Sequence, residues 1–161
     1  MQEKKVIITT FQALEKLRKY CAYSERSHFD VRSKLKQWNI DETASESIIS
    51  SLIEERFLNE ERYTEAYVHG KIRINHWGKN KIKQGLRQHK ISEPCIKRAF
   101  AKIDFDEYIE VLIKEGHKKL NLSKGTNSEK QQKTIQFLIS KGFEFDLIKE
   151  QSDHIFKSKE S

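Results

Sequence analysis

Lysine and arginine side chains that could bind an anion recur along residues 71–102. Lys79, Lys83 and Arg87 are spaced at i, i+4 and i+8, so a helix would project them as one ridge. Ile82 and Leu86 would then face the interior. Such a ridge can neutralise several phosphates of a nucleic acid, and it would equally suit an acidic groove of a protein.

Trp77 places an aromatic ring among these cations, shortly after Lys71 and Arg73. Packing in the core or between units is the first expectation for this side chain. Stacking on an unpaired base is the second, because aromatic rings bind single strands in that way. The candidate contact residues are Lys71, Arg73, Trp77, Lys79, Lys81, Lys83, Arg87, Lys90, Lys97 and Arg98.

The charges are unevenly distributed along the chain, which carries a net +7 and has an isoelectric point near 9.3. Residues 67–102 hold ten Lys or Arg and one acid, Glu93, which gives +9 over 36 residues. Residues 41–65 hold eight acids against Arg56 and Arg62, which gives −6. A solvated face usually mixes both signs, so this pattern predicts an acidic segment followed by a basic binding surface.

The motifs of catalysis and metal binding are missing from the sequence. The six His residues are scattered without an HExxH pattern, and there is neither a GxxxxGK[ST] nor a GxGxxG loop. His89 and Cys95 lie six residues apart, and a metal or thiol-base role is conceivable, but a surface His and a core Cys are the better interpretation. We therefore expect a binding protein without cofactor or metal, not an enzyme.

The composition favours a helical protein of the cytosol. Apolar residues make up 36% and charged residues 34% of the 161 residues, with one Pro and six Gly. Cys21 and Cys95 are far apart and are expected to be reduced and packed. The N-terminus lacks a signal-peptide pattern, and no apolar run reaches membrane-spanning length. We expect a soluble, cytoplasmic monomer.

Apolar side chains follow a 3.6-residue period along most of the sequence and predict an all-α fold. Val6 to Thr10 could form a brief extended entry segment, and Phe11, Leu14 and Leu17 form the first apolar stripe. The expected helices then span residues 27–38, 42–57, 60–76, 78–89 and 94–103, followed by helices around 108–113, 128–139 and 146–156. Residues 117–127 are expected to form a loop. Candidate N-caps are Ser24 or Ser27, Asp41 or Thr43, Asn59, Ser92, Ser128 and Asp146.

An internal repeat organises these helices. The segment from Leu35 to Ile40 matches the segment from Leu86 to Ile91 at an offset of 51 residues, and the segment from Leu138 to Phe143 follows 52 residues later. This register predicts three tandem three-helix repeats at 10–57, 58–104 and 105–156, with an N-terminal extension at 1–9 and a tail at 157–161. Each unit is too small to bury much alone, so neighbours should share apolar faces in an elongated, curved molecule.

Three stretches of the sequence resemble the RecX family of regulators of the RecA recombinase. They are Leu58-Asn-Glu-Glu-Arg-Tyr63, Tyr23-Ser-Glu-Arg-Ser27, and Trp77-Gly-Lys-Asn-Lys-Ile82 with the following Leu86 and Lys90-Ile91. The resemblance spans roughly residues 10–156. The chain departs from the family pattern at Lys90, where the family usually has Gly, and in its acid pair, which is usually Asp-rich.

This resemblance implies a three-repeat helical protein that binds the RecA filament on single-stranded DNA. It would inhibit or modulate strand exchange and the coupled ATP hydrolysis without being an ATPase. The basic middle repeat would face the filament and contact recombinase, single- or double-stranded DNA, or both. The alternative is a stand-alone basic helical module for nucleic-acid binding, for which the ridge is the whole mechanism.

Overall fold

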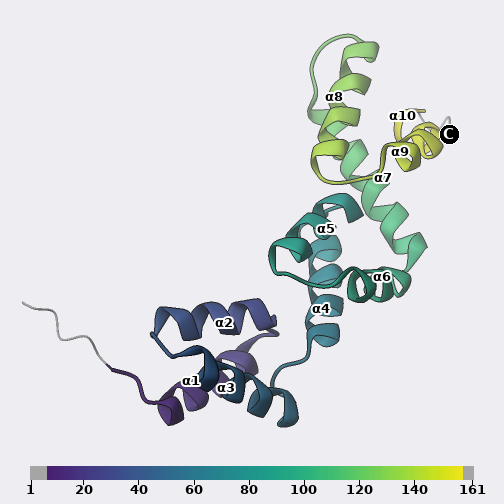
Figure 1. The fold of residues 1–161 in the computed structure, drawn as a ribbon. Coiled ribbons are helices and arrows are strands. Elements are labelled where there is room, and N and C mark those ends of the chain that lie inside the picture. Colours follow the sequence, from purple (N-terminus) through teal and green to yellow (C-terminus); the bar gives the residue numbers. More distant parts are fainter. Residues whose placement is uncertain (1–6, 158–161) are drawn as a thin grey trace, which may run out of the picture.

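The computed structural model describes residues 7–157, and over that range the fold is all-helical, as predicted. Figure 1 shows an elongated and curved arrangement of the helices. The helices are α1 (Thr10–Tyr23), α2 (His28–Gln37), α3 (Glu42–Glu54), α4 (Glu60–Arg73), α5 (Lys79–Gln88), α6 (Glu93–Ala101), α7 (Phe105–Leu122), α8 (Asn127–Ser140), α9 (Phe145–Glu150) and α10 (Ser152–Phe156). The first unit comprises α1–α3, the second α4–α6 and the third α7–α10.

Several predicted N-caps are confirmed. The side chains of Ser27, Asp41, Asn59 and Ser92 each accept a hydrogen bond from a backbone N–H in the first turn of the following helix. Four other candidates were wrong: Ser24 ends α1, Thr43 lies inside α3, Thr126 caps α8 in place of Ser128, and Glu144 precedes α9 in place of Asp146.

The repeated segments are helix ends of one geometry. Asn39, Lys90 and Gly142 all have positive φ, at 56°, 57° and 96°. In each case the next residue donates its N–H to the carbonyl of the leucine five positions earlier, as Ile91 does to Leu86 at 3.1 Å. This pattern is the Schellman motif, in which an apolar residue after the left-handed position packs back on the helix. The departure from glycine at Lys90 therefore leaves the turn unchanged.

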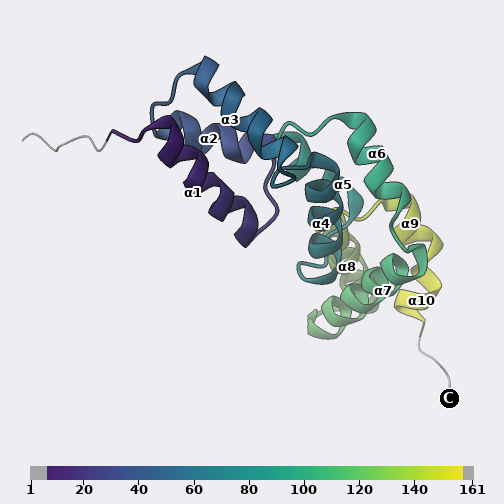
Figure 2. The same cartoon turned by 90° about the horizontal axis from the view of Figure 1, so that it is seen from below.

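The apolar core is divided into two parts. The first unit has its own core around Leu17, Leu35 and Leu52. The second and third units share one continuous core, which includes Leu86 and Leu138. The prediction that neighbouring units share apolar faces thus holds for the second and third units. The first unit instead meets the second through polar and aromatic side chains beside the connection from α3 to α4, which Figure 2 shows from below.

Backbone contact fixes the second unit against the third. The N–H of Gly78 donates to the carbonyl of Lys141 at 2.8 Å, and the N–H of Asn80 donates to the carbonyl of Gly142 at 2.9 Å. A Cβ on Gly78 would lie 2.3 Å from the carbonyl carbon of Gly142. Glycine is required at this position because the two backbones touch.

Three expectations about local structure were wrong. The single helix expected at 146–156 is divided into α9 and α10 at Gln151. Residues 117–127 are not a loop, because α7 continues to Leu122 and leaves only a short connection before α8. Residues 117–120, His-Lys-Lys-Leu, have adequate helix propensity, and buried Gly116 is held against Ile155 of α10. In the first stripe the structure buries Ala13, Leu17 and Cys21, while Phe11 is 68% exposed.

The structure describes only part of the two terminal segments that the sequence predicted, the extension at 1–9 and the tail at 157–161. Thr10 belongs to α1 and not to an extended segment, and Val6 lies outside the described residues. The same holds for most of the expected extension at 1–9 and for the tail beyond Lys157. Among residues 7–157 no helix is long and apolar enough to cross a membrane.

Candidate functional site

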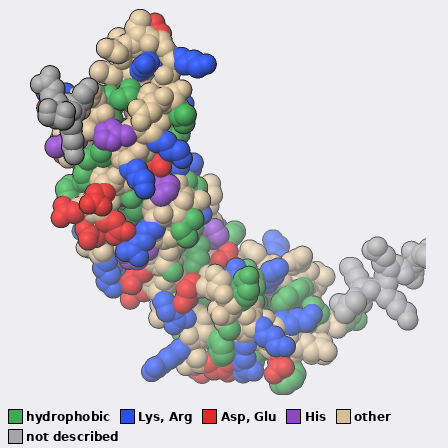
Figure 3. All heavy atoms as spheres, turned by 180° about the vertical axis from the view of Figure 1, so that it is seen from behind, with side chains coloured by type: hydrophobic (Ala, Val, Ile, Leu, Met, Phe, Trp, Pro, Cys, Tyr) green, Lys and Arg blue, Asp and Glu red, His purple; other side chains and the backbone are tan. Residues whose placement is uncertain are grey.

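Folding partly cancels the predicted separation of acidic and basic segments. Arg98 of α6 donates to Glu61 of α4 at 2.7 Å, and Lys102 pairs with Glu65 on the same two helices. Glu61 and Glu65 are therefore neutralised by cations of the segment that was expected to oppose them. On the face in Figure 3, Lys and Arg are spread over all three units and interleaved with Asp and Glu.

Arg73 is also engaged within the protein. Its Nε donates to Glu107 of α7 at 2.6 Å, and Nη2 donates to the other carboxylate oxygen at 3.1 Å. The hydrogen bonds from Arg73 lower the pKa of Glu107. Arg73 and Arg98 were both predicted contact residues. In the structure each forms an ion pair that joins two helices, although both side chains remain exposed.

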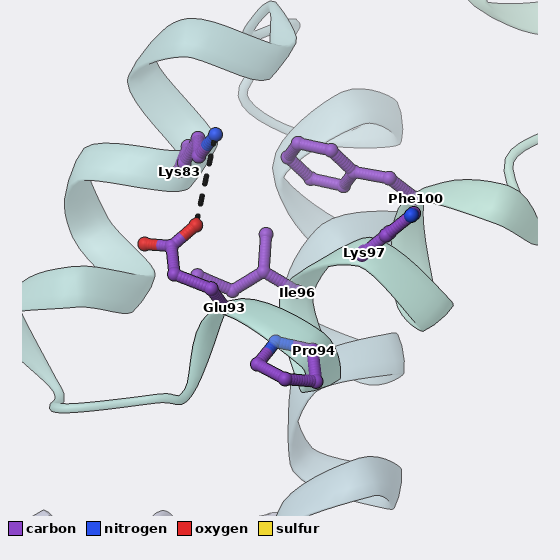
Figure 4. A pocket seen from close by; sticks show the side chains of 6 residues that line it. All are labelled: Lys83, Glu93, Pro94, Ile96, Lys97 and Phe100. Atoms are coloured by element: carbon purple, nitrogen blue, oxygen red, sulfur yellow. Dashed lines mark ion pairs between the residues drawn. The ribbon is translucent and has the colours of Figure 1, made fainter.

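The expected ridge on α5 is partly neutralised by Glu93. Arg87 donates to Glu93 at 2.7 Å, and Lys83 Nζ lies 3.7 Å from its other oxygen. Figure 4 shows Lys83 and Glu93 pointing toward each other between α5 and α6, beside Ile96 and Phe100. The hydrogen bond from Arg87 is the main reason that the pKa of Glu93 is lowered. The acid that appeared isolated in the sequence therefore lies against the ridge.

Lys79, at the start of the same helix, is directed toward the third unit. Its Nζ lies 5.2 Å from the ring centroid of buried Tyr108, and its backbone N–H donates to the Tyr108 hydroxyl oxygen at 2.9 Å. That hydroxyl in turn donates to Glu144. Burial of the ring raises the pKa of Tyr108 far above its ordinary value. Lys79 therefore helps to join α5 to the third unit.

A different set of cations surrounds Trp77. Lys71 Nζ lies 4.6 Å and Lys81 Nζ 4.5 Å from the ring centroid. Lys71 also lies 5.2 Å from the ring of Tyr67. Trp77 is half-buried and packs against the shared core of the second and third units. The packing role expected for Trp77 is confirmed, and its ring is at the same time bracketed by two lysines without a carboxylate partner among residues 7–157.

Lys90 and Lys97 complete the predicted set and stand apart from the Trp77 cluster. Lys90 is exposed at the left-handed position after α5, and Lys97 is exposed on α6 at the edge of the pocket in Figure 4. Neither forms an ion pair within the part of the chain that the structure describes. The ten predicted residues thus fall into three groups: the cluster around Trp77, the cations that join one helix to another, and the two separate lysines.

The structure also shows a second cation–aromatic cluster, on the first unit, that the sequence analysis missed. Tyr20, Tyr23 and Trp38 line one pocket together with Lys16, Lys19, Arg26 and Lys34. The 51-residue repeat could have located it, because Tyr20 and Arg26 correspond to Lys71 and Trp77. Each of these two pairs is a cation–aromatic contact with the roles exchanged.

No metal site forms among residues 7–157, and His89 and Cys95 do not contact each other there. No group of three or more His, Cys, Asp or Glu side chains is placed to hold a metal ion there. Cys95 is buried, with its sulfur 3.4 Å from the Thr64 hydroxyl. His89 instead turns toward the first unit, where its Nδ1 lies 3.1 Å from Asp30. The two residues do not act together.

Comparison with known proteins agrees with this architecture. Residues 59–99 match the family domain described as "RecX, second three-helix domain", and residues 106–150 match "RecX, third three-helix domain". A regulatory protein RecX of Clostridium perfringens is 33% identical over 73% of this chain and 56% of its own length. One of Streptococcus uberis is 31% identical over 81% of this chain and 50% of its own length. The chain thus spans about half the length of these relatives.

Solved structures show the same fold. The crystal structure of a regulatory protein RecX aligns with a TM-score of 0.82 at 26% identity, over 89% of this chain and 73% of that one. RecX from Lactobacillus salivarius aligns with a TM-score of 0.81 at 25% identity, over 91% of this chain and 96% of that one. With two three-helix domains matched in sequence and the whole arrangement matched in space, the chain belongs to the RecX family.

Proposed function

We propose that the chain is a regulator that binds the RecA recombinase filament on single-stranded DNA and lowers its strand-exchange and ATPase activity. The observation that carries this proposal is the match of both family domains, together with relatives that are named regulatory proteins. The chain acts by binding alone, as a cytoplasmic monomer. Its elongated, curved shape suits contact along a filament groove, where a globular protein of this size would touch less surface.

The surface assigned to the filament is the cluster of Lys71, Trp77 and Lys81. These lysines have no carboxylate partner among residues 7–157, so their charge is available to an anionic surface. The ridge of Lys83 and Arg87 contributes less, because Glu93 neutralises part of it. A paired cation must also give up or share its carboxylate before it binds another anion, whereas the ammonium groups of Lys71 and Lys81 lie over aromatic rings.

The test is the ATPase activity of RecA on single-stranded DNA, measured while the purified chain is added up to equimolar amounts. We expect hydrolysis to fall, and to fall less with the double variant Lys71→Gln/Lys81→Gln. The control is Lys114→Gln/Lys118→Gln, which removes the same charge from exposed positions of α7. Unchanged hydrolysis and unchanged filament stability with the unmodified chain would contradict the proposal.

The second candidate function is a stand-alone module for nucleic-acid binding, which the unpaired lysines around Trp77 also favour. Measuring DNA affinity and RecA inhibition separately on the same variants distinguishes the two. Loss of DNA affinity with retained inhibition indicates a protein groove as the target of this cluster. Neutral glutamine is the right replacement on α5, because a reversed charge at Lys83 or Arg87 would repel Glu93 and disturb the fold.

A further inference from the structure

The pocket on the first unit combines aromatic faces with cations in close contact. The guanidinium carbon of Arg26 lies 3.8 Å from the ring centroid of Tyr20, and Lys34 Nζ lies 5.4 Å from the same centroid. Lys16 Nζ lies 5.7 Å from the centroid of Trp38. These side chains come from α1, the α1–α2 connection, α2 and the residue that ends α2. These side chains are separated in the sequence and come together only in the folded first unit.

The positive charge of this pocket is not balanced by neighbouring acids. Lys16, Arg26 and Lys34 form no ion pair among the described residues, and no carboxylate lines the pocket. The acids near these cations in the sequence are already engaged. Glu15 lies 3.8 Å from Arg18, and Glu25 pairs with Arg62. Asp30 accepts from the Ser27 N–H and faces His89. The pocket therefore differs from the α5 ridge, where Glu93 supplies a counter-charge.

Tyr23 adds an aromatic ring that the fold does not use. It is 88% exposed at the end of α1, although it lines the pocket. Its counterpart one repeat later, Ile74, is 78% exposed, whereas buried Leu17 and Val68 correspond at the same offset. The first and second units thus present equivalent faces, each with an exposed apolar side chain beside a cation–aromatic contact. Packing in the core accounts for Leu17 and Val68, which are buried, but it does not account for the exposed ring of Tyr23.

We propose that this pocket is a binding site for single-stranded nucleic acid. Lys16, Lys19 and Lys34 would neutralise backbone phosphates, while the rings of Tyr23 and partly buried Trp38 would stack on unpaired bases. Aromatic stacking with cations that follow the backbone is the usual chemistry of single-strand recognition. A duplex offers only its terminal base faces to an exposed ring. An acidic peptide could use the lysines but would gain little from the ring of Tyr23. The site needs no recombinase and thus goes beyond the proposed regulatory function.

The proposal is tested by fluorescence anisotropy of a labelled oligothymidylate with the full chain and without any recombinase. Tyr23→Ala should weaken binding roughly five-fold or more, because each stacked base contributes substantially. Lys16→Gln/Lys34→Gln should weaken it further and reduce the slope of log affinity against log salt by about 1.4, at about 0.7 per phosphate contact. Lys114→Gln/Lys118→Gln, which removes equal charge from the third unit, should have a smaller effect on both.

A second measurement uses the fluorescence of Trp38, which lines the pocket. In the variant Trp77→Phe, Trp38 is the remaining tryptophan, and its fluorescence should be quenched by the oligothymidylate, with less quenching after Tyr23→Ala. Circular dichroism checks that each variant is folded. The proposal is wrong if the control pair weakens binding as much as the pocket pair, if a duplex binds as tightly as the single strand, or if polyglutamate competes equally well. A failure to inhibit RecA would leave these results unaffected, so the two proposals fail separately.

Discussion

His89 and Asp30 meet across the junction between the first and second units, with His89 Nδ1 3.1 Å from Asp30 Oδ1. His89 ends α5, while Asp30 lies in the first turn of α2. The Ser27 hydroxyl lies 3.4 Å from the same nitrogen, and the ring of Phe29 contacts the imidazole edge-on with centroids 5.7 Å apart. His89 thus contacts the first unit across a junction that, unlike the one between the second and third units, has no shared apolar core.

Removing this contact should loosen the first unit from the second. We expect His89→Ala to accelerate trypsin cleavage after Arg56, an exposed residue with φ 62° just before the connection to α4. The contacts of His89 with Asp30 and Phe29 hold α5 against the first unit, and without them the connection between the two units should open more often. Segments that open locally are cleaved first. The cleavage rate under native conditions is the measurement. His117→Ala, which removes a hydrogen bond to the His154 carbonyl within the third unit, is the control and should leave this rate unchanged.

Substitution of Gly142 should destabilise the second and third units together. Gly142 has φ 96°, and a Cβ there would lie 2.5 Å from the backbone nitrogen of Lys81. For Gly142→Ala we expect a loss of about 2 kcal/mol or more, because strained backbone and steric overlap add. Thermal unfolding followed by circular dichroism measures it. In the matched control Gly70→Ala, a Cβ has open space inside α4, and we expect a gain of about 0.5–1 kcal/mol.

Replacing Lys90 by glycine, the residue usual in the family at this turn, should stabilise the protein. Lys90 adopts φ 57°, and its N–H donates to the Arg87 carbonyl at 3.0 Å within the Schellman motif. A residue with a Cβ is disfavoured in this conformation, so Lys90→Gly should raise the free energy of unfolding by roughly 0.5–1 kcal/mol. Lys90→Ala separates this effect from the lost charge and should change stability little. Equal stability of the Gly and Ala variants would show that the turn is unstrained.

The parts of the fold that the sequence predicted depend on local chemistry. Ser27, Asp41 and Ser92 cap the helices they precede, because a cap needs only the next three residues. Charge pairing could not be predicted in the same way, since Glu61 and Arg98 are 37 residues apart and meet only when α4 and α6 pack. The acidic and basic segments therefore exist in the sequence, but part of their charge is paired in the folded protein.

The candidate sites show the same limit. The spacing of Lys79, Lys83 and Arg87 correctly placed these residues on one helix, but the counter-charge comes from Glu93 on the next helix. The pocket on the first unit was missed because Tyr20, Arg26 and Lys34 lie in three successive segments, none of which is conspicuously basic. A cluster of this kind becomes visible only when the repeat offset is applied to the cations and rings as well as to the apolar core.

Acidification should destabilise the protein through its surface ion pairs. The hydrogen bonds from Arg32, Arg18, Arg87 and Arg73 lower the pKa of Glu46, Glu55, Glu93 and Glu107 below the ordinary 4.5. A carboxylate whose pKa is lower in the folded state binds fewer protons than in the unfolded state, so its contribution is complete above pH 4.5 and is lost as the pH falls through the folded value.

The midpoint of urea unfolding should therefore fall progressively below pH 4.5, and less steeply at high salt, because these exposed pairs are screened. Glu55→Gln should flatten this dependence, since Arg18 binds both oxygens of Glu55 at 2.7 Å. The control Glu54→Gln, at the neighbouring exposed position of α3, removes a carboxylate outside the described ion pairs. If the two variants flatten the curve equally, the Arg18–Glu55 pair does not cause the acid sensitivity.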